Sequence, residues 1–219
     1  MVQTQLETPR IEGTAVIRNE PVQARSAARL TALLDAAAHV VHEIGYERLT
    51  TAMVADRAGA SIGTVYRYFP DRIAVLQSLA ARNAERTIGR ALAEVSNPAN
   101  TDWFLALGSV FEQIKFAFRD EPGFASLRYG DVLDLRPATG HSAIQGFADN
   151  VFDGLVARFE LDGSSQARIA FAAVVVAADA LTARAFWQDP NGDEDFLLAG
   201  VATAAAIMSP YWGTPATLA

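Results

Sequence analysis

The sequence predicts an all-α protein of about nine helices. Apolar residues recur at helical spacing over most of the chain, and the alternating pattern typical of strands is missing. The 219 residues are 51% hydrophobic and 20% charged, which is the balance of a packed globular protein and excludes a disordered one. A chain of this length forms one domain or two small ones.

The first part of the chain predicts an arm followed by a long helix. Residues 1–20 are polar and without a period, so we expect a flexible arm. Pro21 suits a first helical turn, and Gly45 suits the left-handed conformation that ends a helix. Between them a helix over 22–44 is predicted from one apolar face, formed by Leu30, Leu33, Leu34, Ala37, Val41 and Ile44.

Two short helices joined by a glycine-containing turn are predicted over 50–70. Thr50 or Thr51 can cap the first, which runs to Ala58, and Ser61 can cap the second, because a hydroxyl accepts an unpaired backbone N–H. Gly59 ends the first helix. Such a pair forms a helix-turn-helix. Its expected apolar packing comes from Val54, Ala55, Ile62 and Val65.

The chain beyond Arg72 reads as helix, interrupted at proline and glycine. A loop is expected over 130–140. The helices are expected over 73–95, 103–119, 124–129, 141–161, 166–188 and 193–208.

The second short helix carries the residue types that bind DNA. A recognition helix presents short polar side chains to base edges and phosphates, and a glycine lets the backbone approach the groove. The alternative from spacing alone is a surface helical hairpin whose tyrosines are half-buried packing. The candidate DNA contacts are Thr51, Ser61, Gly63, Thr64, Tyr66, Arg67, Tyr68 and Arg72.

The same stretch resembles a known family. Residues 45–51 read GYERLTT, residues 54–55 read VA, and residues 58–72 read AGASIGTVYRYFPDR. Together they resemble the N-terminal signature of TetR-type transcriptional repressors. By that likeness five residues align with DNA-contact positions of the family, namely Thr51, Thr64, Tyr66, Tyr68 and Arg72.

The resemblance implies an architecture and a function. It implies a three-helix DNA-binding domain over 21–72 and a helical effector-binding and dimerisation domain over 73–219. It further implies a homodimer, a palindromic double-stranded DNA operator, and repression that a small molecule relieves. The sequence does not give the operator sequence, the effector or the regulated genes. It also does not show whether the protein represses or activates transcription.

Charge is divided unevenly along the chain. Residues 1–95 hold eleven arginines against ten acidic residues, whereas residues 96–219 carry a net charge of −8, within a total of −7. Such an asymmetry can mark a polyanion-binding segment joined to an acidic remainder. An acidic body would help the protein leave non-specific DNA, because it repels phosphates.

Two C-terminal helices predict a subunit interface. The helix over 166–188 contains a stretch, 169–178, that is apolar on every side and therefore needs burial on every side. The helix over 193–208 is similarly apolar and has small side chains. We expect both helices of each subunit to form a four-helix homodimer interface. The alternative is a core helix pair within a single-chain bundle.

Aromatic residues cluster in the middle of the chain with a few polar ones, a mixture that lines ligand pockets. Any one of these aromatics can instead be core. Asp179, inside an apolar helix, is a buried hydrogen-bonded group, a ligand anchor or a dimer contact. The candidates for binding an apolar effector are Trp103, Phe111, Phe124, Arg128, Tyr129, His141, Phe147, Phe171 and Asp179.

The remaining patterns disfavour an enzyme. There is no cysteine, and His39 and His42, spaced i, i+3, have no further histidine near them to complete a metal site. Phosphate-loop, dinucleotide and nucleophile-elbow fingerprints are missing. We therefore expect no cofactor, no metal and no catalytic residue. The main alternative function is a helical adaptor that binds protein and not DNA.

The sequence also predicts a cytoplasmic protein. The first ten residues lack the basic start and apolar core of a signal peptide. The uncharged stretch at 196–219 is diluted by alanine, threonine, glycine and proline, whereas a membrane span needs about 20 strongly apolar residues.

Overall fold

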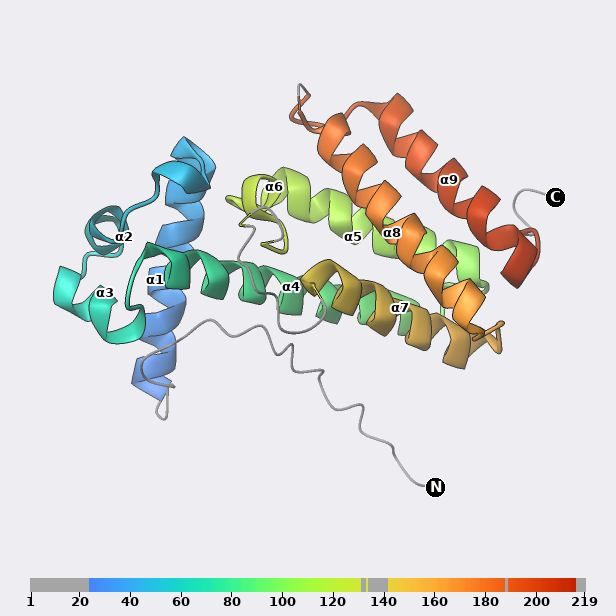
Figure 1. Ribbon diagram of the computed structural model, residues 1–219, viewed down its shortest axis with the longest axis horizontal. Coiled ribbons are helices and arrows are strands. Elements are labelled where there is room, and N and C mark those ends of the chain that lie inside the picture. The colour runs from blue at the N-terminus through green and yellow to red at the C-terminus, as the bar shows by residue number, and fades with distance from the viewer. Residues whose placement is uncertain (1–23, 131–132, 134–141, 188, 216–219) are drawn as a thin grey trace.

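The computed structural model describes residues 24–130, 133, 142–187 and 189–215. Over these residues the chain is all-helical, with nine α-helices and one 3-10 helix (Figure 1). The predicted fold class is therefore confirmed. The arm predicted for residues 1–20, His141 and nearly all of the predicted 130–140 loop lie outside the described residues.

The N-terminal helices form a small group at the left of Figure 1. Side-chain caps begin the two short helices as predicted: Thr50 accepts from the Met53 N–H at 3.2 Å and Ser61 from the Thr64 N–H at 3.1 Å. A 3-10 turn after Gly45, which the sequence did not indicate, connects the first two helices. The elements are α1 (Ala24–Ile44), η1 (Tyr46–Arg48), α2 (Thr51–Arg57) and α3 (Ile62–Tyr68).

Helix α4 (Arg72–Ser96) runs from this group into the rest of the molecule (Figure 1). Asp71 begins it by accepting from the Ala74 N–H at 2.9 Å. Its first half, including Leu76 and Leu79, is buried in a core shared with α1, α2 and α3. Its second half, including Ile88 and Val95, is buried in a separate core. One continuous helix therefore belongs to both cores.

The second group packs around the far half of α4. Its last helix runs past the predicted end at Met208 and through Pro210. The helix continues because Trp212 is buried, with its ring 5.4 Å from that of Trp103 and 5.5 Å from that of Phe171. The elements are α5 (Trp103–Asp120), α6 (Phe124–Leu127), α7 (Ala143–Phe159), α8 (Ser165–Ala185) and α9 (Glu194–Trp212).

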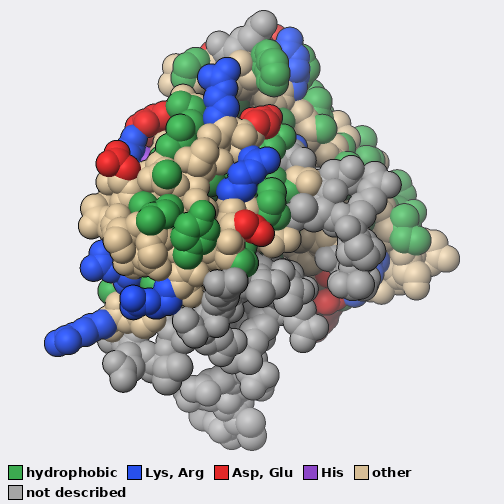
Figure 2. Space-filling view, turned by 60° about the vertical axis from the view of Figure 1, so that its left-hand side comes forward, with side chains coloured by type: hydrophobic (Ala, Val, Ile, Leu, Met, Phe, Trp, Pro, Cys, Tyr) green, Lys and Arg blue, Asp and Glu red, His purple; other side chains and the backbone are tan. Residues whose placement is uncertain are grey.

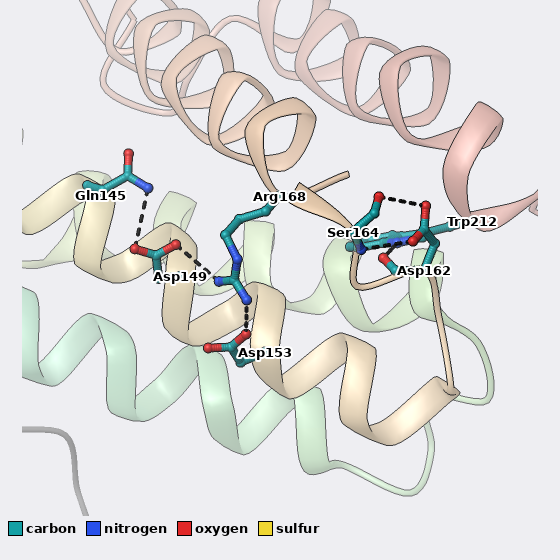
Figure 3. A network of polar contacts seen from close by, with 7 residues as sticks. All are labelled: Gln145, Asp149, Asp153, Asp162, Ser164, Arg168 and Trp212. Carbon is teal, nitrogen blue, oxygen red and sulfur yellow. Dashed lines mark hydrogen bonds and ion pairs between the residues drawn. The ribbon is translucent and has the colours of Figure 1, made fainter. Parts of the chain in front are cut away.

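Polar contacts fix α8 against α7 and α9 (Figure 3). Arg168 of α8 pairs with Asp149, at 3.2 Å, and with Asp153, both on α7. At the α7–α8 turn, Asp162 accepts from the Ser164 N–H at 2.8 Å, and its backbone carbonyl accepts from the Trp212 indole at 3.1 Å. The ends of α8 and α9 are therefore tied to one turn.

Arg158 holds the end of α4 against α7. Its guanidinium donates to the carbonyls of Val95, Asn97 and Asn100, the last two at 2.8 and 2.7 Å. Carbonyls at a helix C-terminus lack intrahelical partners, and a cation there satisfies them and opposes the negative end of the helix dipole. The far end of α4 is thus anchored to α7.

Helix α8 is unusually apolar for a helix with so much exposure. Among the described residues it is the one helix with the length and composition that could cross a membrane, and 28% of its apolar window is buried in the single chain. Ile169 and Val176 are 71% and 57% exposed. Much of its apolar surface therefore has no cover within one subunit.

The start of α6 touches α1 at Gly123, which has φ 73°. A Cβ built on this residue would lie 2.6 Å from the Ala38 carbonyl oxygen and 3.1 Å from the Val41 Cβ. No side chain fits there without moving the backbone, so the glycine sets how closely the two helix groups approach.

Gly123→Ala is expected to lower the free energy of unfolding by roughly 1–3 kcal/mol, because it adds both left-handed strain and a steric clash. Gly89→Ala is the matched control: Gly89 lies within α4, and a Cβ added to it would meet nothing within 4 Å, so alanine should raise stability by about 0.5–1 kcal/mol. Urea unfolding of both variants measures the difference; equal stabilities would contradict the close approach.

Candidate nucleic-acid interface and ligand cavity

The turn between α2 and α3 has a defined geometry. The Ala60 N–H donates to the Ala55 carbonyl at 2.9 Å and the Gly59 N–H to the Asp56 carbonyl at 3.1 Å, with Gly59 at φ 56°. This pattern is the Schellman motif, which requires a left-handed residue. Glycine at 59 therefore sets the angle between the two short helices.

Helix α3 has one buried and one exposed side. Val65 and Tyr68 are buried against α1 and α4. Tyr66 and Ile62 are 44% and 42% exposed. The packing role expected of Ile62 is therefore wrong: Ile62 is the first residue of the helix and points away from the core that Val65 fills. Val54, Ala55 and Val65 do pack as predicted.

The exposed side of the two short helices is polar and internally connected. Thr51 Oγ1 donates to the Tyr66 hydroxyl at 3.4 Å, which links the start of α2 to the middle of α3. Ser61 Oγ and Thr64 Oγ1 lie 2.9 Å apart in a hydrogen bond. Four of the predicted DNA contacts therefore form one hydroxyl-bearing surface.

Gly63 lies in the middle of this surface, and nothing inside the chain requires a glycine there. A Cβ added to it would meet only Ser61 Oγ, at 3.9 Å, and its φ is not left-handed. A helical glycine costs stability relative to alanine. Packing inside the described part of the chain therefore gives no reason for a glycine at this position.

Tyr68 lies differently from the other predicted contacts. Its ring is 5% exposed, and its hydroxyl shares a 3.0 Å hydrogen bond with Ser26 Oγ near the start of α1. This bond brings the beginning of α1 beside the end of α3. Arg25 and Arg29, both exposed and one helical turn apart on α1, lie on either side of Ser26 in the sequence. Sequence reasoning missed them, although their i, i+4 spacing is visible.

Two other cations on this end of the molecule, Arg72 and Arg57, are held in place. Arg72 donates to the Glu47 carbonyl at 3.0 Å, which fixes it at the start of α4. Arg57 of α2 pairs with Glu43 of α1, and this hydrogen bond holds the pKa of the Glu43 carboxyl below its ordinary value. Arg67 is exposed on α3. Figure 2 shows cationic and apolar side chains together at this end.

A cavity lies within the second helix group. Its volume is about 50 Å³, measured as the space open to the centre of a water molecule. Helices α5, α7, α8 and α9 supply most of its walls. Of the predicted effector residues, five line it: Phe111, Tyr129, Phe147, Phe171 and Asp179.

Three other predicted effector residues lie elsewhere. Trp103 is packed against Phe104 and Trp212, and Phe124 is fully buried between Phe118 and Tyr129. Arg128 is outside the wall but pairs with Asp179, with Nε 3.4 Å from Oδ2. His141 is outside the described residues.

Small residues, which sequence reasoning did not single out, create the cavity. Gly108, Ala178, Gly200 and Ala204 line it. A Cβ on Gly200 would meet the Phe111 ring at 3.3 Å, so this glycine gives the ring its room. Small residues on otherwise apolar helix faces were the sequence feature that could have indicated this cavity.

The histidine pair of α1 is solvated. His39 and His42 are both exposed. Over the described part of the chain, no group of three or more histidine, cysteine or acidic side chains could hold a metal ion.

Comparisons with known proteins find relatives of both the helix-turn-helix and the whole fold. The family model described as "Bacterial regulatory proteins, tetR family" matches residues 33–79, which span α1 to the first part of α4. A solved TetR-family transcriptional regulator from Streptomyces coelicolor is 29% identical and has a TM-score of 0.71, over 84% of this chain and 99% of that one.

Residues 33–79 thus match the TetR family, and the fold of the described chain is that of a TetR-family regulator. Among TetR-family relatives, it is 33% identical over 90 residues to the repressor KstR of Rhodococcus jostii, across 41% of each chain. It is 28% identical over 147 residues to the nucleoid occlusion factor SlmA of Haemophilus influenzae, across 67% of this chain and 62% of that protein. The match thus spans less than two thirds of these relatives' length.

Ser61, which caps α3, and Gly63, which lies within α3, differ in what the fold requires of them. Ser61→Ala should lower the free energy of unfolding by about 1 kcal/mol, because it removes the α3 cap. Gly63→Ala should leave it unchanged or raise it by about 0.5 kcal/mol. Urea unfolding at one protein concentration checks both. A destabilised Gly63→Ala variant would mean that the glycine serves the fold after all.

Proposed function

We propose that this chain is a DNA-binding transcriptional regulator, a repressor that binds a palindromic operator as a homodimer and leaves it when an apolar small molecule binds. The observation that carries the proposal is the exposed hydroxyl surface of α2 and α3 with Gly63 at its centre. Hydroxyl donors and a bare backbone suit phosphates and a groove wall. No catalytic role is proposed, and we propose the cytoplasm as its location.

The proposed functions are divided between the two helix groups, each with its own core. Residues 21–72 would bind DNA, residues 73–219 would bind the effector and the second subunit, and residues 1–20 would form an arm. Thr51, Tyr66 and Arg72 would contact phosphates. The other proposed DNA contacts are Ser61, Gly63, Thr64, Arg67 and Tyr68, the last after exchange of its bond to Ser26.

The proposed subunit interface is the outer face of α8 and α9. Ile169, Val176 and Leu198 are 71%, 57% and 58% exposed in one chain. Burial of apolar surface contributes about 25 cal/mol per Å², so a second copy that covers this face is favoured. In Figure 1 the two helices lie side by side at the edge opposite α1–α3. A symmetric pair would then present two recognition helices to successive major grooves.

Release from DNA is proposed to follow a two-state equilibrium. A ligand in the cavity shifts that equilibrium only by its differential affinity for the two states. Helix α4, buried in both cores, is the element that would change the separation of the recognition helices.

Salt dependence separates this proposal from a protein-binding adaptor. Selection from a random duplex pool identifies the bound sequence, and its affinity is then followed against salt concentration. Phosphate contacts release counterions, so affinity should fall steeply as salt rises. Selection that recovers no duplex would favour the adaptor.

Tyr66→Phe should weaken binding to the selected operator about five- to tenfold, because one hydroxyl donor is lost. Arg72→Ala should weaken it and also reduce the salt slope by about one per lost phosphate contact. Arg119→Ala, an exposed cation on α5 paired with Asp120, is the control and should bind as the wild type does. Full affinity in both test variants, with unchanged thermal unfolding, would exclude the assigned contacts.

Val176→Glu should shift the protein from dimer to monomer, because it places a charge in the centre of the apolar α8 face. Leu105→Glu changes an exposed leucine on α5, outside that face, and should leave the dimer intact. Analytical ultracentrifugation at micromolar concentration measures the oligomeric state of both variants. A dimeric Val176→Glu variant would place the interface elsewhere.

A further inference from the structure

The cavity has an apolar wall with one charged member. Of the described residues that line it, Asp179 alone has a carboxyl or basic side chain, and Tyr129 contributes the other polar side-chain group. The rest of the wall is phenylalanine, aliphatic side chains and glycine. A carboxylate in such surroundings favours a partner that donates hydrogen bonds and carries positive charge.

Asp179 already has such a partner. Arg128, which follows α6, places Nε 3.4 Å from Asp179 Oδ2, and the two side chains are 26% and 18% exposed. Arg128 does not line the cavity, whereas Asp179 does. The ion pair therefore borders the cavity through Asp179 and not through Arg128.

We propose that the cavity takes an apolar molecule with one cationic, hydrogen-bond-donating group, and that this group competes with Arg128 for Asp179. The inference rests on the proposed effector function and names its ligand class. A ligand carboxylate would place a second negative charge beside Asp179 in apolar surroundings, where charge repulsion is weakly screened. Anionic ligands of equal apolar size are therefore disfavoured.

The competition would reach the DNA-binding end through α6. Arg128 has φ 46°, which is costly for a residue other than glycine, and its carbonyl accepts from the buried Asn83 side chain of α4 at 3.2 Å. Arg128 caps the C-terminal end of α6, and Gly123, which contacts α1, caps its N-terminal end. A ligand that takes Asp179 from Arg128 thus removes one restraint on the helix that touches both α4 and α1.

Three probes of equal chain length test the ligand class with the full-length protein. Octylamine, octanol and octanoate differ in head group only, and isothermal titration at neutral pH compares their affinities. Octylamine should bind at least about tenfold more tightly than octanoate, the difference expected for a charge-assisted hydrogen bond. Equal affinities, a preference for octanoate, or no binding by any probe would overturn the proposal.

Two variants should change the preference for octylamine in opposite directions. Asp179→Asn should abolish the preference for octylamine, and Arg128→Gln should increase octylamine affinity, because the internal competitor is gone. Asp153→Asn is the matched control, since that carboxylate also pairs with an arginine, Arg168, but does not line the cavity. A preference that survives Asp179→Asn would contradict the proposed anchor. If Asp179→Asn does not fold, the wild-type probe series and Arg128→Gln still decide.

Measuring release from the operator distinguishes a wrong ligand class from a wrong proposed function. Octylamine should lower the affinity for the selected duplex, and octanoate should do so at least about tenfold less effectively. Octylamine binding that depends on Asp179 but leaves DNA affinity unchanged would support the ligand class and refute release by an effector. Release by octanoate alone would support an effector function and refute the ligand class.

Discussion

The membership of α4 in two cores is the constraint on which the rest of the structure depends. Leu76 and Leu79 pack with the N-terminal helices, and Ile88 and Val95 pack with the C-terminal group. Interiors at native packing density resist gradual deformation, so a shift of one core is carried to the other as movement of the shared helix. The surface of α3 and the cavity are thus connected through α4, although they lie in different helix groups, and α6 adds a second contact with α1.

Polar contacts with α1 reinforce that connection near the middle of α4. Arg82 donates to Asp35, at 2.6 Å, and to the Leu34 carbonyl, at 3.3 Å, both on α1. Burial and the nearby Arg86 charge lower the pKa of Arg82, whereas Asp35 opposes that shift. The Arg82 side chain is mostly buried whereas Asp35 is half exposed, so loss of Asp35 would leave the guanidinium without its ion-pair partner. Helix α1 is consequently held to α4 by charge as well as by apolar packing.

Local chemistry explains which features were predictable. Caps at Thr50 and Ser61, the glycine turn at Gly59 and the helical periodicities involve neighbours within a few residues, and each is visible in sequence. The end of α9 was placed too early, because Pro210 suggests a stop whereas the burial of Trp212 against α5 and α8 outweighs it. Burial in the tertiary structure overrode the local signal.

Spatial pairings explain what could not be predicted. Arg128 and Asp179 are far apart in sequence, and so are Ser26 and Tyr68, so no spacing rule indicates either contact. The cavity shows the same limit. Aromatic residues indicated that the second helix group could hold a pocket, but aromatics fill space as readily as they enclose it. The empty volume depends on which of them faces a glycine, as Phe111 faces Gly200.

The three carbonyls held by Arg158 have a mechanical consequence for α4. With its C-terminal end fastened to α7, the helix cannot slide along its axis without dragging α7 with it. Rotation about the fastened end is the motion that remains. Over a helix of 25 residues, about 37 Å long at 1.5 Å per residue, a tilt of about 5° displaces the N-terminal end, together with the core packed on it, by about 3 Å. A small rearrangement around the pivot is therefore amplified at the opposite end of the molecule.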